Sequence, residues 1–125
     1  MKTLITFILL ITFSFTNAQS NYQKGMQKAF ELWGNQKNEE AANLFERIAL
    51  AEKENWLPFY YAAQIKIINT FNTKDRKNTI PNLEKAQDLL NQAKTWSQNN
   101  VETVVLQALL PVSYTHLTLP TIYSV

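Results

Sequence analysis

The stretch NEEAANLFERIA, residues 38–49, decides the fold class of this chain. Its apolar residues recur at steps of three and four, which places them on one face of an α-helix: Ala41, Leu44, Phe45, Ile48 and Ala49. Asn38 is a favoured N-cap residue, and Glu39 and Glu40 carry negative charge into the first turn, where it interacts favourably with the helix dipole. We therefore expect a helix that begins after Asn38 and buries one face.

The same spacing predicts a helix before this stretch and another after it. The earlier helix is expected to begin at Ser20 or Asn21, either of which can cap it, and to end at Gly34-Asn35. Because only about four residues separate it from the next helix, the two must fold back on each other as a hairpin. The later helix begins near Pro58 and is apolar almost all round, as expected when neighbours cover both sides.

The second half of the chain repeats the pattern with a longer connection. The polar segment 69–78 is expected to form a solvated loop, and a fourth helix follows over 80–96. The apolar stripe of the fourth helix comprises Leu83, Ala86, Leu90 and Ala93. A fifth helix opens at Val101 and is expected to end at Pro111, since proline interrupts a helix.

A fixed period relates the two hairpins. Ala29 and Ala63 are 34 positions apart, whereas Ala63 and Ala108 are 45 apart. Ala41 and Ala86 are also 45 apart, so one 34-residue period holds if the second unit carries an 11-residue insertion near 69–78. The residues expected to pack at equivalent places in the repeat are Ala29, Ala41, Phe45, Ile48, Ala63, Ala86, Leu90, Ala93 and Ala108.

A helix–turn–helix unit of 34 residues is the period of the tetratricopeptide repeat. The segments EAANLFERI (40–48) and KAQDLLNQA (85–93) resemble the second helix of that repeat, and Gln98 stands where the family's turn has Pro. The resemblance implies about two and a half units over 19–110, in which antiparallel hairpins stack as a short all-α solenoid. It also implies a non-catalytic module that binds a peptide or a partner protein. A helical bundle without a repeat is the alternative fold.

The resemblance further implies a concave groove lined by the first helix of each unit. The side chains that it places there are Gln23, Met26, Phe30, Trp33, Tyr60, Gln64 and Ile67. Aromatic and Met side chains would offer a peptide or a partner helix large apolar contact with few rotatable bonds. The other interpretation is that these aromatic residues are core, since aromatic stripes at helical spacing are ordinarily buried. Trp56 and Trp96, near the unit ends, are expected to pack between repeats.

The N-terminus is typical of a cleaved secretory signal peptide over residues 1–18. Lys2 precedes the apolar run 4–13, and Thr16-Asn17-Ala18 has the small residues of a cleavage site. Because the chain has no Cys, a lipid cannot be attached at a processed N-terminal Cys. We therefore expect a periplasmic or secreted protein with no stable membrane span after cleavage.

The C-terminal segment 111–125 differs from the helical middle, because it carries no charged residue. Residues 112–121 resemble one translated reading frame of the transposon-end adapter used in sequencing libraries, and a natural β-prone tail is the alternative. We expect the native sequence to differ after Leu110. The whole protein could then be a longer exported enzyme or envelope-assembly factor with these hairpins as its N-terminal accessory region. The last helix would expose an apolar side that promotes self-association: Val104, Val105, Leu106, Ala108 and Leu109.

Composition excludes several classes of function. The chain has 125 residues, with 12 Lys or Arg, 10 Asp or Glu, two Gly and no Cys. This composition excludes a disulfide scaffold, a thiolate metal site, a phosphate-binding glycine loop and a dedicated nucleic-acid surface. The one His, His116, lies in the suspect tail, so no Ser–His–Asp triad is predicted. The basic cluster Lys74, Arg76 and Lys77 is expected to be a solvated loop. We therefore predict no enzyme activity, cofactor or metal.

Overall fold

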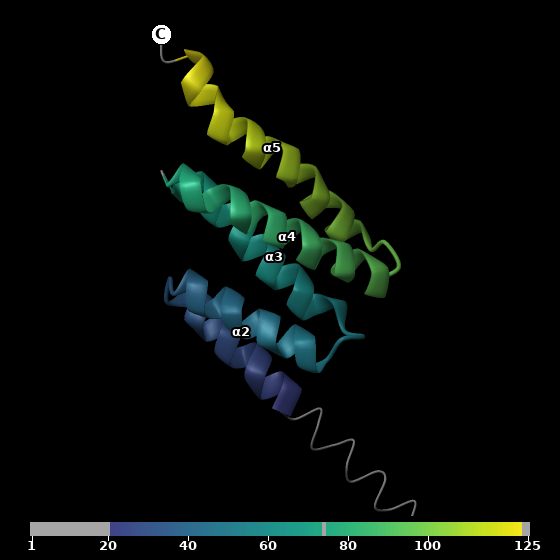
Figure 1. Ribbon diagram of the computed structural model, residues 1–125. Helices are drawn as coiled ribbons and strands as arrows, with labels where there is room; N and C mark the ends of the chain where they lie inside the picture. The colour runs from purple at the N-terminus through teal and green to yellow at the C-terminus, as the bar shows by residue number, and fades with distance from the viewer. Residues whose placement is uncertain (1–20, 74, 124–125) are drawn as a thin grey trace, which may run out of the picture.

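The computed structural model describes residues 21–73 and 75–123, and within these ranges every regular element is a helix (Figure 1). The first helix covers residues 21–34. It is followed by α2 (Asn38–Ala51), α3 (Trp56–Asn72), α4 (Arg76–Trp96) and α5 (Val101–Tyr123). The expectation of an all-α chain is confirmed. No helix in the described part of the chain has both the length and the apolarity needed to cross a membrane.

Three sequence-based expectations fall on residues that the structure does not describe. The signal peptide, 1–18, and the cap residue Ser20 lie outside the described residues, as does Lys74 of the basic cluster. The side chains of Arg76 and His116 are likewise outside them. Lys77, the remaining member of the basic cluster, is exposed in the first turn of α4.

The helices pack in chain order as stacked layers (Figure 1). The first helix reaches both neighbours through Phe30, whose ring contacts Phe45 of α2 and Tyr61 of α3. Further along the chain, α2 packs against α3, α3 packs against α4, and α5 packs against both α3 and α4. The first hairpin and α5 therefore lie at opposite ends of the stack, with α3 and α4 between them.

The core consists of small and large apolar residues contributed by all of the described helices. The repeat-packing residues that are fully or almost fully buried are Ala29, Ala41, Phe45, Ala63, Ala86, Leu90 and Ala93. Ile48 is half-buried and lies against Gly25, where an added Cβ would come within 3.2 Å of the Ile48 Cδ1 atom. Ala108 is exposed, contrary to expectation, because α5 packs through its opposite side.

The first hairpin turns through a left-handed residue that is not glycine. Gln36 has φ of 62°. The amide of Gln36 donates to the carbonyl of Trp33 (3.0 Å), and the amide of Lys37 donates to that of Leu32 (2.9 Å). This pair of bonds is the Schellman arrangement that closes many helices, usually with glycine at the left-handed position. Gly34 is thus the last helical residue, as expected, but it does not make the turn.

The expected cap of α2 is wrong by one residue. Lys37 is the N-cap and makes no side-chain cap bond, whereas Asn38 is the first residue of the helix. The Asn38 Nδ2 atom instead donates to the Oδ1 atom of Asn69 in α3, at 2.8 Å. The carboxamide therefore joins two helices rather than closing the end of its own.

The expected solvated loop over 69–78 is also wrong. Only residues 73–75 separate α3 from α4, because α3 runs to Asn72 and α4 begins at Arg76. Thr70 and Thr79 are buried here. The Thr70 hydroxyl donates to the carbonyl of Ile67, and the Thr79 hydroxyl donates to the carbonyl of Asp75. Eleven residues make about three helical turns, so an insertion of this length can lengthen two paired helices and keep their buried faces aligned.

The expected end of the fifth helix at Pro111 is contradicted, since α5 continues to Tyr123. Proline removes one backbone hydrogen bond from the helix but leaves the following ones in place. Two hydroxyls bond back one turn beyond this point: Ser113 Oγ donates to the carbonyl of Leu109 (3.0 Å) and Thr115 Oγ1 donates to that of Pro111 (2.8 Å). The β-prone composition of this segment does not decide its structure, because strand preference depends on a neighbouring strand to pack against.

Candidate functional site

Aromatic side chains from three helices form one continuous cluster. The members of this aromatic cluster are Trp33, Phe30, Phe45, Tyr61, Tyr60 and Trp56. Phe30 joins the three helices, with ring centroids 5.1 Å from Phe45 and 4.8 Å from Tyr61, both edge to face. Separations of this kind are favourable for aromatic pairs and contribute beyond the area they bury. The cluster therefore fixes the first helix against α2 and α3.

The cluster extends along α3 through adjacent rings. Tyr61 contacts Tyr60 with centroids 5.3 Å apart, and Tyr60 contacts Trp56 at 5.7 Å. At the other end, Trp33 stacks on Phe30 at 6.5 Å and lies 6.4 Å from Tyr61. Each ring of the cluster thus lies against at least one neighbouring ring.

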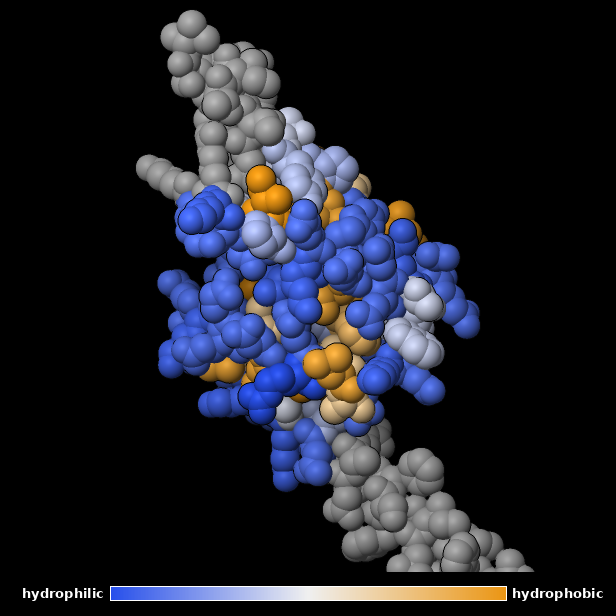
Figure 2. All heavy atoms as spheres, in the orientation of Figure 1, coloured by the Kyte–Doolittle hydropathy of each residue, from blue (hydrophilic) through white to orange (hydrophobic). Residues whose placement is uncertain are grey.

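The cluster is buried at its base and open at its edge. Phe45 is fully buried, whereas Phe30 is 40% exposed and the remaining rings are half-buried. The base of the cluster is therefore core, and its edge is surface. Figure 2 shows that apolar side chains on the face in view form separate patches within a largely polar surface.

A shallow, open hollow lies beside the exposed edge of the cluster. It has a volume of about 370 Å³ and is lined by Phe30, Trp33 and Gly34. A Cβ added at Gly34 would meet no atom within 4 Å. Gly34 is therefore not needed for close packing, unlike Gly25, and its missing side chain leaves the hollow open beside Trp33.

The residues predicted to line a groove separate into three groups. Phe30, Trp33 and Tyr60 come together in the aromatic cluster. Gln23 is exposed and Gln64 is half-buried. Met26 and Ile67 are buried and belong to the hydrophobic core, so they line no groove. The repeat register had assigned Met26 and Ile67 to the open side of the stack, but the first helix and α3 pack against their neighbours through these two positions.

Trp96 and Tyr61 depart from the expected arrangement, whereas the contact of Trp56 leaves its expectation open. Trp56 contacts Tyr60 within its own helix. Trp96 is exposed at the end of α4, so the expectation that it packs between repeats is wrong. Tyr61 was not predicted to belong to the site, although its four-residue step from Leu57 and to Ile65 follows the buried stripe of α3.

Two tyrosines have a raised pKa: Tyr60, which belongs to the aromatic cluster, and Tyr22, which lies outside it. Burial raises the pKa of Tyr60 above its ordinary value of 10.0, and the charges of Glu102 and Tyr61 raise it further. Burial also raises the pKa of Tyr22, although a hydrogen bond with Asn55 opposes the shift. Neither hydroxyl is therefore prepared to act as a base or nucleophile near neutral pH, whereas both keep a donor for hydrogen bonding.

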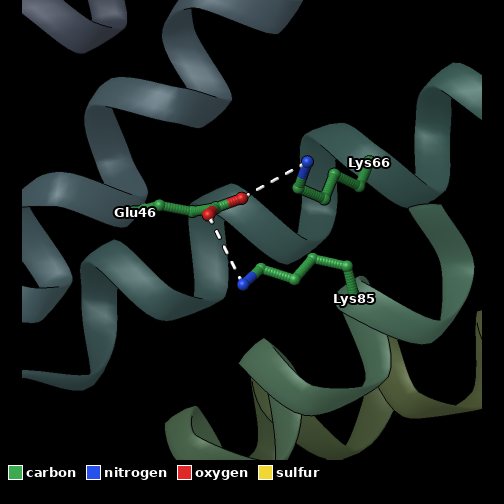
Figure 3. Close-up of polar contacts among 3 residues, drawn as sticks. All are labelled: Glu46, Lys66 and Lys85. Carbon is green, nitrogen blue, oxygen red and sulfur yellow. Dashed lines mark ion pairs between the residues drawn. The ribbon is translucent and has the colours of Figure 1, made fainter. Parts of the chain in front are cut away.

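A second feature, missed by the sequence analysis, is an ion-paired cluster between three helices (Figure 3). Glu46 of α2 lies between Lys66 of α3 and Lys85 of α4, with O–N distances of 3.3 Å and 3.8 Å. The Lys66 side chain is only 8% exposed, and that of Glu46 is 20% exposed. The available signal was Lys66 itself, which is the single charged residue in the sequence of α3.

A polar pocket of about 340 Å³ lies next to Lys66, near the connection between α3 and α4. The residues that line it all have polar or charged side chains: Glu39, Lys66, Asn69, Thr70, Asn72, Thr73, Asp75, Asn78, Thr79 and Asn82. Much of this polarity is already used, since Asn38 bonds Asn69 and Asn78 donates to Asp75 twice. Among the described residues, no three His, Cys, Asp or Glu side chains converge to hold a metal ion.

The described part of the chain is therefore an all-helical protein whose distinctive surface is a fixed aromatic edge. No protein-family model, curated protein or solved structure matches the chain.

Proposed function

We propose that this chain is an exported, non-catalytic interaction module of the tetratricopeptide-repeat kind, which binds a peptide or a partner protein at the edge of the aromatic cluster. In such a solenoid the first helices of successive units lie side by side, and so do the second helices. Three contacts support this arrangement. Phe30 of the first helix meets Tyr61 of α3, α3 packs against α5, and Glu46 of α2 pairs with Lys85 of α4.

The single observation that carries the binding role is the exposed, fixed edge of the cluster. Phe30 is 40% exposed although its ring is held by three other rings. Large aromatic side chains that are already ordered bind a partner with little further loss of conformational entropy, and Trp and Tyr are enriched among the residues that dominate binding energy. Export rests on residues 1–18, whose pattern is that of a signal peptide.

The proposal predicts that Trp33→Ala weakens partner binding while the helices persist. Peptides selected from a displayed random library on the full chain serve as probes, and their affinities are measured by isothermal titration calorimetry. Loss of a dominant aromatic contact should weaken binding by roughly 30-fold, equivalent to about 2 kcal/mol. Circular dichroism checks that helicity is retained.

Trp96→Ala is the matched control, because Trp96 is an exposed tryptophan at the end of α4 and is not a member of the aromatic cluster. It should leave the affinity of the selected peptides unchanged. Equal affinities for wild type and Trp33→Ala would show that the cluster edge is not the binding surface. A milder variant, Trp33→Phe, covers the case in which Trp33→Ala unfolds. If Trp33→Ala unfolds and Trp33→Phe binds the peptides as wild type does, Trp33 is a core residue only.

A second prediction concerns the hollow beside Gly34. Gly34→Ala should stabilise the chain by about 0.5–1 kcal/mol, because alanine favours the helix and its Cβ meets open space. Gly34→Glu should also fold, yet it should weaken peptide binding at least tenfold by filling the hollow with a charged side chain. Urea denaturation and the same titrations measure both effects. Unchanged peptide affinity in Gly34→Glu would remove the hollow from the binding site.

A further inference from the structure

The polar pocket lies where α2 begins and where α3 meets α4. Its volume is about 340 Å³, and six of its ten lining residues come from the segment 69–78. Lys66, Thr70 and Thr79 are the buried members of the lining. No residue of the aromatic cluster lines the pocket, so the pocket needs an explanation of its own.

The polarity of the pocket is not needed to hold α3 and α4 together. Both helices bury apolar side chains elsewhere, among them Ile67 of α3 and Leu83 of α4. Replacing a buried ion pair by apolar side chains is often neutral or stabilising, so the pairing of Lys66 with Glu46 is not explained by stability alone. Departures from the most stable choice are expected at functional sites. A polar ligand therefore explains the lining better than packing does.

Hydrogen bonds within the lining orient the side chains around the pocket. The Oδ1 atom of Asn69 accepts from the Nδ2 atom of Asn38 at 2.8 Å. The Oδ2 atom of Asp75 accepts from the Nδ2 atom of Asn78 at 2.7 Å. The Asp75 amide donates to the Thr73 hydroxyl at 3.2 Å, which leaves the proton of that hydroxyl free to donate. Groups that are ordered in advance lose less conformational entropy when a ligand binds.

Two carboxamides of the lining have no partner among the described residues. Neither Asn72 nor Asn82 makes a hydrogen bond there. Asn82 is half-buried, and no buried side-chain polar atom of the described residues lacks a partner, so its carboxamide is open to the pocket that it lines. A carboxamide offers donors and an acceptor at one place, and a ligand hydroxyl both donates and accepts. The two carboxamides therefore suit a ligand with several hydroxyls.

Three other classes of ligand fit this lining poorly. An apolar ligand would leave the polar groups unpaired. A metal ion would need convergent ligands, and no three His, Cys, Asp or Glu side chains converge within the described residues. An anion would need an uncompensated positive charge. Lys66, the cation of the described lining, is paired with Glu46, and the Asp75 carboxylate already caps the N-terminus of α4.

We propose that the polar pocket binds one ring of a neutral, polyhydroxylated ligand, namely a monosaccharide unit. The carboxamides of Asn72 and Asn82 and the hydroxyl of Thr73 bind the hydroxyls of the sugar. The Lys66 ammonium group offers a further donor. A volume of about 340 Å³ is near the lower end of ligand pockets, which favours one ring over a longer chain. None of these residues belongs to the aromatic cluster, so sugar binding does not rest on the proposed peptide binding.

The experiment is a titration of the isotope-labelled full chain, followed by two-dimensional NMR. The probes are D-glucose, D-galactose, D-mannose, L-rhamnose and N-acetyl-D-glucosamine. At least one of them should shift the side-chain amide signals of Asn72 and Asn82, with a Kd of about 1 mM for so small and polar a ligand. The methyl glycoside of that probe mimics the end of a glycan. Equal binding of the glycoside assigns the pocket to a glycan end, and loss of binding assigns it to a free monosaccharide.

Two variants test the carboxamides directly. Asn82→Ala should weaken binding of the same probe about tenfold, because it removes the hydrogen bonds of one carboxamide. Asn72→Ala should do the same, and because Asn72 is exposed, this variant keeps the test if Asn82→Ala unfolds. Asn43→Ala is the matched control, because Asn43 is an exposed helical asparagine that does not line the pocket. Asn43→Ala and Trp33→Ala should leave sugar affinity unchanged. Circular dichroism checks the helicity of each variant.

The absence of a shift with every probe would overturn the proposal, and so would equal affinities for wild type, Asn72→Ala and Asn82→Ala. Shifts confined to the aromatic cluster would place the sugar on Trp33 instead of in the pocket. Inorganic phosphate should cause no shift. If phosphate shifts the signals of Asn72 and Asn82 and no sugar does, the pocket is an anion site. Peptide titrations of Trp33→Ala report on the aromatic cluster alone, so the proposed function and sugar binding can fail separately.

Discussion

Replacing Glu46 with alanine should lower the free energy of unfolding by roughly 2–4 kcal/mol, although Glu46 lies outside the aromatic cluster. The reason is Lys66, whose side chain is 8% exposed and whose ammonium group lies 3.3 Å from the Glu46 carboxylate. Without that carboxylate, the lysine is left as a charge with little solvent around it. Removing one partner of a buried pair costs more than the pair itself contributes, because the remaining charge has lost its compensation.

The polar pocket limits how large this effect can be. Lys66 lines the pocket, together with Glu39 and Asp75. Water or a shifted carboxylate could therefore reach the ammonium group after Glu46 is removed, and this relaxation places the expected loss below the largest values seen for buried pairs. Urea denaturation followed by circular dichroism measures the change as a lower midpoint at an unchanged slope.

Two further variants separate the buried pair from ordinary surface charge. Lys85→Ala should cost at most about 0.5 kcal/mol, because Lys85 is 54% exposed and lies 3.8 Å from Glu46. The double variant Glu46→Ala with Lys66→Met should recover most of the stability, since it removes both charges and keeps an apolar side chain of similar length. Equal losses in Glu46→Ala and Lys85→Ala would contradict the buried-pair explanation.

The helices and their buried stripes follow from the sequence because burial imposes a period on the apolar residues. Leu83, Ala86, Leu90 and Ala93 recur at helical steps, and all four are fully buried in α4. The small residues Ala41 and Ala86 belong to the same periodic pattern and are also fully buried. Periodicity is insensitive to exact helix ends, so these features do not depend on where each helix begins.

The helix ends were less predictable because they depend on contacts between distant residues. Asn38 has the character of a cap, yet its carboxamide bonds Asn69, which lies 31 positions away. The segment 69–78 is polar, yet Thr70 and Thr79 are buried with their hydroxyls bonded to nearby carbonyls. The polar composition of this segment therefore predicted a loop. The segment instead contains the ends of two helices, whose backbone carbonyls accept the hydrogen bonds of the threonine hydroxyls.

The candidate site was predictable in its aromatic residues but not in how they assemble. Phe30, Trp33 and Tyr60 were recognised from their spacing, whereas Phe45 and Tyr61 join them only because three helices converge. The pairing of Glu46 with Lys66 also depends on how the helices pack, since the sequence of neither helix alone identifies the partner residue in the other helix. Such partners are fixed by the packing of the helices, which the residue spacing within one helix does not reveal.

Replacing Phe45 with alanine should have the largest effect of the substitutions considered, a loss of about 3–5 kcal/mol in the free energy of unfolding. Phe45 is fully buried, and its ring centroid lies 5.1 Å from Phe30 and 5.4 Å from Tyr61. The substitution leaves a cavity under the exposed edge of the cluster and removes two aromatic contacts, each worth about 0.5–1.5 kcal/mol. Urea denaturation measures the loss.

Leu90→Ala is the comparison for this result, because the proposed repeat makes Leu90 the equivalent of Phe45, and Leu90 is also fully buried. Leucine truncation in a core costs about 3–5 kcal/mol, so the two losses should be similar if the hairpins are equivalent units. Only Phe45→Ala should also weaken peptide binding, since Phe45 supports the ring of Phe30 and Leu90 does not belong to the cluster. A Phe45→Ala variant that costs less than about 1 kcal/mol would show that the cluster is loosely packed, and the fixed aromatic edge would then lose its basis.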